Sequence, residues 1–109
     1  MIVKESHVTA ALEYLSDDPH PIAVARKAVT DAENEAKQIF ARSFLAGSGS
    51  VDARKAQAEI NEEYVAAKDR ESSATYLLER AKARAKSAEM IIEIWRSENA
   101  NARAAERIR

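Results

Sequence analysis

The chain has no cysteine, only two glycines and two prolines, and a single tryptophan among its 109 residues. Without cysteine it has no disulfide framework and no thiolate chemistry. Because glycine and proline are scarce, long stretches contain no residue that breaks a helix. No window approaches the roughly 20 apolar residues that a membrane span needs, and the N-terminal residues lack the basic and apolar regions of a signal peptide. We therefore expect a soluble cytoplasmic protein that makes no membrane contact.

Both glycines fall in Gly47-Ser48-Gly49-Ser50, which separates two charged, alanine-rich stretches. Gly47 suits the left-handed position after a helix C-terminus, and Ser50 suits an N-cap with Asp52 in the following first turn. Upstream, the segment 17–21 contains both prolines and must end a first helix, with Asp18 or His20 as the cap of the next one. The sequence thus predicts an all-α single domain over residues 1–109, with helices at 6–16, 21–46 and 51–106 and a turn at 47–50.

In the first helix, Ser6 is a candidate N-cap, and the expected buried face follows the spacing of one helical side. That face comprises Val8, Ala11, Leu12 and Leu15.

The last predicted helix has two rows of residues spaced seven apart, as in a coiled coil. The first row comprises Ile60, Ala67, Ala74, Ala81, Ala88, Trp95 and Ala102; the second comprises Tyr64, Glu71, Leu78, Ala85, Ile92, Asn99 and Glu106. Alanine dominates the first row, because 23 of the 109 residues are alanine, so a neighbouring helix can approach closely. The pattern predicts an asymmetric antiparallel hairpin, coiled-coil-like, in which the two rows form the seam.

The two arms of this hairpin differ in length. At 1.5 Å per residue, the arm 21–46 is roughly 39 Å long and the arm 51–109 up to roughly 88 Å. The C-terminal part of the seam therefore needs the first helix, a second copy or another protein to cover it. We expect a homodimer whose interface contains Leu78, Ala85, Ile92 and Trp95; a break near Asn99 that folds the chain back is the alternative.

Charge is distributed unevenly along the chain. Residues 1–76 carry a net charge of −4, whereas residues 77–109 carry +3. Arg96, Arg103 and Arg107 fall within about 40° of one another around a helix, which makes them candidates for contacts with phosphates or an acidic protein surface. The alternative is a solvated flank in which Arg96 pairs with Glu93 and Arg103 with Glu106.

Little in the sequence indicates catalysis. Asp17, Asp18 and His20 are potential metal ligands, but helix termination and capping explain them without a metal. The loop 47–50 lacks the Lys-Ser/Thr ending of a phosphate-binding loop and follows a helix instead of a strand. We expect no enzymatic activity, no cofactor and no metal.

One segment resembles a known group of proteins. Residues 92–97, Ile-Glu-Ile-Trp-Arg-Ser, precede an alanine- and asparagine-rich tail and follow a central Gly-Ser loop and an Ala58-Glu59…Tyr64 element. This combination, over roughly residues 35–105, is similar to small uncharacterised helical proteins of tailed bacteriophages, often encoded near recombination genes. The resemblance implies a phage or prophage origin, the cytoplasm of a bacterial host, and an accessory role in DNA recombination or host defence. It assigns no catalytic residue.

Two functions remain open. The first is a protein–protein interaction module whose partner is a phage or host protein, contacted through Trp95 and the three arginines. The second is direct binding of nucleic acid by the same arginines.

Overall fold

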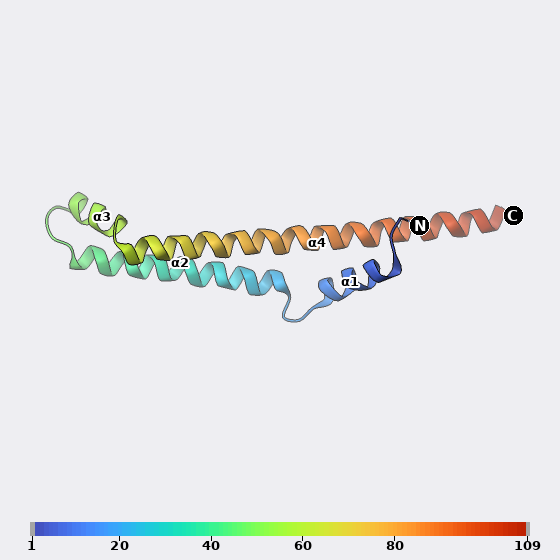
Figure 1. Cartoon of the computed structure of the whole chain (residues 1–109), viewed down its shortest axis with the longest axis horizontal. Coiled ribbons are helices and arrows are strands. Elements are labelled where there is room, and N and C mark those ends of the chain that lie inside the picture. Colours follow the sequence, from blue (N-terminus) through green and yellow to red (C-terminus); the bar gives the residue numbers. More distant parts are fainter. Residues whose placement is uncertain (1, 109) are drawn as a thin grey trace. The chain divides into compact units, whose positions relative to one another are not determined.

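The computed structural model describes residues 2–108 and is shown in Figure 1. These residues form α1 (Glu5–Ser16), α2 (Pro21–Ala46), α3 (Val51–Glu59) and α4 (Glu62–Ile108), with no strand among them. The predicted all-α class is therefore confirmed. Contacts divide the chain into two compact units: unit 1 comprises Met1–Ile22 and Arg80–Arg109, and unit 2 comprises Ala23–Glu79.

The bounds of α2 match the prediction, and local side chains fix the starts of α2 and α3. At its start, Nδ1 of His20 accepts a hydrogen bond from the Ile22 N–H at 3.1 Å. His20 thus satisfies one of the N–H groups that a helix start leaves without a partner. The Ser50 side chain likewise caps α3, accepting from the Ala53 N–H at 3.2 Å, and Asp52 lies in the first turn of that helix.

The turn between α2 and α3 differs in detail from the prediction. The glycine with positive φ is Gly49 (φ 97°), not Gly47. Gly47 is instead constrained by the side chain of Gln57, because a Cβ at Gly47 would meet Gln57 Oε1 at 2.8 Å. Gln57 donates a hydrogen bond to the Ser48 carbonyl at 2.9 Å and accepts one from the Ser48 N–H at 3.2 Å. One side chain from α3 therefore holds the turn closed.

The predicted helix over 51–106 is wrong at one point, because the structure breaks it after Glu59. Asn61 Oδ1 accepts hydrogen bonds from the N–H groups of Glu63 at 2.9 Å and Tyr64 at 3.3 Å, so Asn61 caps a new helix. Glu62 and Glu63 then occupy the first turn, where negative charge favours a helix start. Ile60, placed in the predicted seam, lies at the break and is 77% exposed.

The core of unit 2 contains few residues, and two of its three buried members are alanines. It consists of Ala36 and Ile39 of α2 and Ala67 of α4, with Tyr64 packed against them. The Tyr64 and Phe40 rings meet edge to face with centroids 5.3 Å apart, and Arg70 Nη2 lies 2.6 Å from Glu35 Oε1. Within unit 2, contacting residue numbers therefore fall along α4 as they rise along α2.

The core of unit 1 joins α1 to the second half of α4. Its buried members are Ala11 and Tyr14 from α1 and Ala85 and Ala88 from α4, with Leu15, Ile22, Ile91 and Ile92 packed against them. The predicted face of α1 is partly wrong: Leu12 is 52% exposed, and Tyr14 takes the buried place instead. Ser6 is not the N-cap either, since α1 begins at Glu5 after Lys4.

Candidate functional site

The second half of α4 carries a surface hollow that contains three of the seven candidate site residues from the sequence, Trp95, Arg96 and Arg103. The hollow has a volume of about 440 Å³. Its lining consists of Trp95, Arg96, Asn99, Ala102, Arg103 and Glu106. These residues recur at the three- and four-residue spacing of one helical face, so a single helix presents them all. The hollow is thus formed by one face of a single helix, a geometry suited to contact with another macromolecule.

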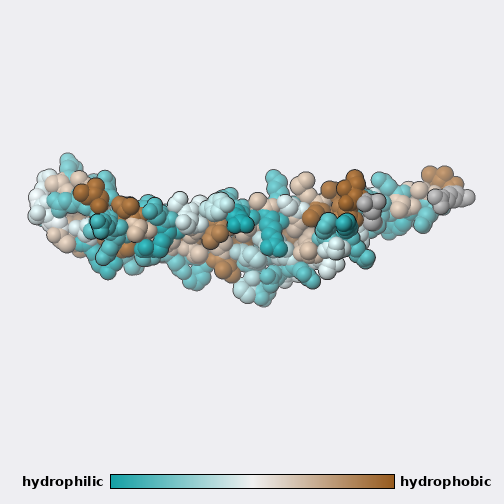
Figure 2. Space-filling view, in the orientation of Figure 1, coloured by the Kyte–Doolittle hydropathy of each residue, from teal (hydrophilic) through white to brown (hydrophobic). Residues whose placement is uncertain are grey.

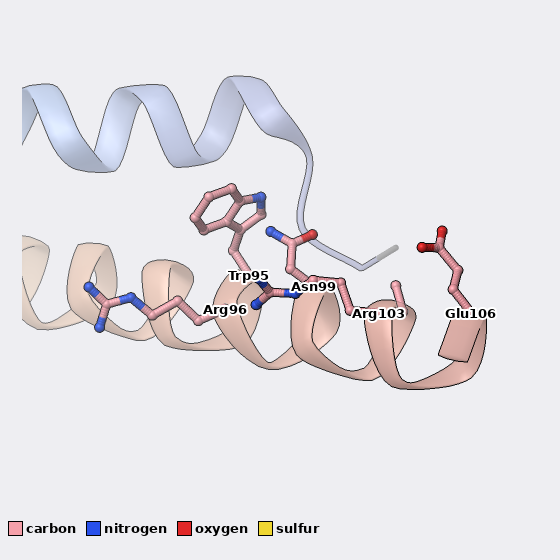
Figure 3. Close-up of a pocket in the computed structure, with 6 residues that line it drawn as sticks. Trp95, Arg96, Asn99, Arg103 and Glu106 are labelled. Carbon is pink, nitrogen blue, oxygen red and sulfur yellow. The ribbon is translucent and has the colours of Figure 1, made fainter. Parts of the chain in front are cut away.

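Figure 3 shows how the side chains of this hollow are directed. The Trp95 indole rises from α4 toward α1, and Asn99 lies beside it. Arg103 extends back along the helix toward Asn99, and Arg96 extends in the same direction, toward the N-terminal part of α4. Trp95 and Asn99 are half-buried, while both arginines and Glu106 are exposed. An apolar ring is therefore flanked by two exposed cations and one exposed carboxylate.

The charged groups here are only weakly restrained. The predicted pair between Arg96 and Glu93 is present, with Nη1 and Oε1 3.8 Å apart and both side chains about 70% exposed (68% and 72%). Exposed pairs of this kind contribute at most about 1 kcal/mol to stability. Arg103 lines the hollow, but Arg107 is not among its lining residues and lies in the last turn of α4. Of the three predicted arginines, the structure therefore brings two to the hollow.

The residues predicted for a dimer interface divide into two groups. Leu78 and Ala85 are each only 8% exposed within the chain itself. Ala85 lies in the unit 1 core, and Ile92 packs against that core. Ile92 and Trp95 are both half-buried, and Trp95 lines the hollow. Within the chain α1 already covers part of the seam, and a dimer interface at these four residues stays a prediction.

Residues before α1 also contribute to the coverage of α4. Val3 is 6% exposed, and the Ile2 N–H donates a hydrogen bond to Glu98 Oε1 at 2.8 Å. The N-terminal segment therefore extends the coverage of α4 to Glu98. Beyond that point, every residue of α4 from Ala100 to Ile108 is exposed.

A cluster around Tyr14 fixes α1 on α4 and was not predicted. Its hydroxyl donates a hydrogen bond to the Ala81 carbonyl at 2.7 Å. The Arg84 guanidinium lies 4.4 Å from the Tyr14 ring centroid, and the His20 ring meets the same ring edge-on at 5.3 Å. Because every polar contact here joins two parts of unit 1, we interpret this cluster as structural.

Potential metal ligands do not cluster in residues 2–108. No group of three or more potential metal ligands occurs among these residues. His20, one of the three candidates considered from sequence, directs Nδ1 to the α2 backbone. The pKa of Lys68 is raised above its usual value by its hydrogen bond to Glu71 and then by that carboxylate's charge, so the ammonium form is favoured. A raised pKa makes Lys68 a poorer base at neutral pH.

No protein-family model, characterised protein or solved structure matches this chain. The resemblance to phage proteins therefore stays a prediction from residues 92–97 and their surroundings. Among the described helices, none has both the length and the apolar character required to cross a membrane.

Proposed function

We propose that this protein is a non-enzymatic helical interaction module that docks another protein through the hollow around Trp95. One observation carries the proposal: the seam of α4 continues to Ala102 and Glu106, yet every residue from Ala100 to Ile108 is exposed in the described part of the chain. Tryptophan and arginine are the side chains most enriched at the energetic centres of protein interfaces. Trp95, Arg96 and Arg103 supply both types on one helix face.

The proposal includes the architecture expected from sequence, an antiparallel helical hairpin that forms a homodimer. The contacts of Glu35 with Arg70 and of Phe40 with Tyr64 support the antiparallel sense of the hairpin. Ala85 is buried within the chain, so this part of the predicted dimer seam is not available to a second copy. Self-association therefore requires another face of α4.

The biological setting is proposed from the sequence resemblance. Its basis is the Ile-Glu-Ile-Trp-Arg-Ser segment at residues 92–97, which includes three residues of the hollow or its ion pair. On this basis the protein is a phage-type accessory factor in the cytoplasm of a bacterial host, and its partner belongs to a recombination or defence complex.

Capture from nuclease-treated bacterial lysate tests the docking proposal. The full-length chain is compared with Arg96→Glu/Arg103→Glu and with the control Arg26→Glu/Arg42→Glu, which reverses two exposed arginines on α2. A protein that docks at the hollow is retained by the control and reduced at least about tenfold by the hollow variant, a loss that corresponds to about 1.4 kcal/mol. Equal capture by both variants contradicts docking at the hollow.

Direct nucleic-acid binding is the second candidate, favoured by the two arginines in the hollow. Phosphate contacts release counterions, so affinity must fall steeply as salt rises. A titration of labelled single- and double-stranded DNA from low to moderate salt measures this dependence. If no binding is detected even at low salt, this candidate is wrong, whereas loss of binding in Arg96→Glu/Arg103→Glu alone supports it.

A further inference from the structure

A second coiled-coil-like stripe runs along the outer face of α4. Its positions alternate spacings of four and three residues over 25 residues of helix. The stripe consists of Ala83, Ser87, Met90, Ile94, Ser97, Asn101, Ala104 and Ile108. This alternation keeps all eight side chains on one side of the helix. We call this set the outer stripe.

From Met90 onward the outer stripe is separate from the face that packs against α1, whereas Ser87 also lines a hollow with Ala11 and Tyr14 of α1. Two residues along a helix correspond to about 200° of rotation, so Met90 and the covered Ile92 lie on opposite sides. Every member of the outer stripe is exposed, including Met90 at 57%, Ile94 at 39% and Ile108 at 87%. Figure 2 shows hydrophobic surface in brown at the C-terminal end of α4.

No member of the outer stripe is charged, although charges surround it. Nine of the 26 residues from Ala83 to Ile108 are charged, and all nine lie outside the stripe. On a solvated helix face, charged residues are expected to be interspersed. An exposed face with coiled-coil spacing and no charge indicates a surface that another helix covers.

We propose that a second copy of this chain docks antiparallel on the outer stripe. With Ser97 opposite Asn101 of the other copy, two short polar side chains meet and can hydrogen-bond at the centre. Ile94 then faces Ala104 and Met90 faces Ile108, so a large side chain meets a small one in the first of these layers. A buried polar residue at such a position specifies register in coiled coils. Shifting by one heptad would instead place Met90 against Asn101.

Flanking charges favour the antiparallel sense. In the proposed register Glu93 of one copy lies beside Arg107 of the other, twice by symmetry. Parallel pairing would instead bring Glu93 beside Glu98 of the other copy, and adjacent like charges are destabilising. Antiparallel pairing does bring the two Glu98 residues near the symmetry axis. Glu98 therefore lies near a like charge in either sense, and the attraction between Glu93 and Arg107 is the contact that distinguishes antiparallel from parallel pairing.

This inference rests on the self-association included in the proposed function but not on docking at the Trp95 hollow. The two can therefore fail separately. If the chain is monomeric but its hollow still captures a partner, only the inference of a second copy on the outer stripe is wrong. If the chain is a dimer but the hollow variant captures proteins as well as the wild type does, only the proposal of docking at the Trp95 hollow is wrong.

Light scattering at several protein concentrations tests the dimer first. The wild-type chain is expected at twice its monomer mass of 12.0 kDa. Met90→Lys/Ile94→Lys places two charges in the outer stripe and is expected to be monomeric. The control Leu45→Lys/Leu77→Lys changes two exposed leucines that lie outside the outer stripe, and this variant is expected to stay dimeric. A monomeric wild type, or a dimer that survives both lysines in the stripe, overturns the inference.

Cross-linking tests the orientation, and the absence of native cysteine makes single-cysteine variants clean probes. Antiparallel pairing predicts that mixed Ile94→Cys and Ala104→Cys chains form a disulfide under mild oxidation. Each variant alone should not, because its two copies lie about 15 Å apart along the helix axis. Ala102→Cys mixed with Ile94→Cys is the control, since Ala102 lies in the hollow and outside the stripe. Efficient cross-linking of Ile94→Cys alone indicates parallel pairing and overturns the proposed orientation.

Discussion

The two ends of the unit 1 part of α4 have similar compositions but different surroundings. From Ala81 to Ile92 the helix buries Ala85 and Ala88 against α1, whereas from Ala100 to Ile108 every residue is exposed. The open part contains four alanines and two arginines, which have high helix propensity, and Arg107 in the last turn complements the helix dipole. Burial holds the first part in place, while local propensity maintains the second and leaves its surface available.

The largest predicted effect comes from placing the same charge in each part. Ala88→Glu puts a carboxylate in a site that is 4% exposed, without a partner, and is expected to lower the free energy of unfolding by at least about 2 kcal/mol. Ala102→Glu, in the open part, is expected to change it by no more than about 0.5 kcal/mol. Urea unfolding followed by circular dichroism and by fluorescence of Trp95 measures both.

The comparison depends on the difference between the two changes in the free energy of unfolding. Equal destabilisation by Ala88→Glu and Ala102→Glu would show that the open part is covered in solution. Such a result, seen only at high protein concentration, would indicate coverage by another copy, because association stabilises a fold by mass action.

The fold could be predicted at positions where the residue type has only one common role in local structure. Pro21 can begin a helix but not continue one, and Ser50 caps whatever helix follows it, so both helix starts were found. Asn61 was missed because asparagine is tolerated inside helices, and the seven-residue pattern of Ile60, Ala67 and Ala74 passes through it. The Asn-Glu-Glu sequence at 61–63 was the available signal, since a cap followed by acidic residues marks a helix start.

A smaller effect is expected from the hydrogen bond that holds α1. Tyr14→Phe keeps the ring beneath Arg84 and removes only the bond to the Ala81 carbonyl, which remains bonded within α4 as a helix carbonyl. The expected loss is about 1 kcal/mol. Arg84→Ala, which removes the cation from the exposed side of the ring, is expected to cost about 0.5–1 kcal/mol.

Fluorescence of Trp95 during urea unfolding checks both variants, because Trp95 lies in unit 1. A loss above about 3 kcal/mol for Tyr14→Phe would mean that the hydroxyl carries far more than one hydrogen bond. No loss from either variant would show that apolar packing alone places α1.

The candidate site was only partly readable from sequence for a related reason. Helical spacing places Trp95 and Asn99 in adjacent rows of one seam and Arg96 and Arg103 in one stripe, because these placements depend only on rotation along one helix. Coverage of Ala85 and Ile92 depends on where α1 folds back, and Tyr14 was overlooked in α1 because leucines are stronger apolar signals than tyrosine. Contacts between distant segments, such as Ile2 with Glu98, carry no local pattern.

The smallest effect is expected at the ion pair beside the hollow. Glu93→Gln removes a partner 3.8 Å from Arg96, where both side chains are mostly solvated, so in dilute solution the free energy of unfolding should change by less than about 0.5 kcal/mol. The same substitution removes the charge that faces Arg107 of a second copy, so it should weaken association while leaving the monomer unaffected. Unfolding at low and high protein concentration separates the two roles. A large loss in dilute solution would show that the open part of α4 depends on Glu93 for its own structure, and the contrast between the two parts of the helix would then disappear.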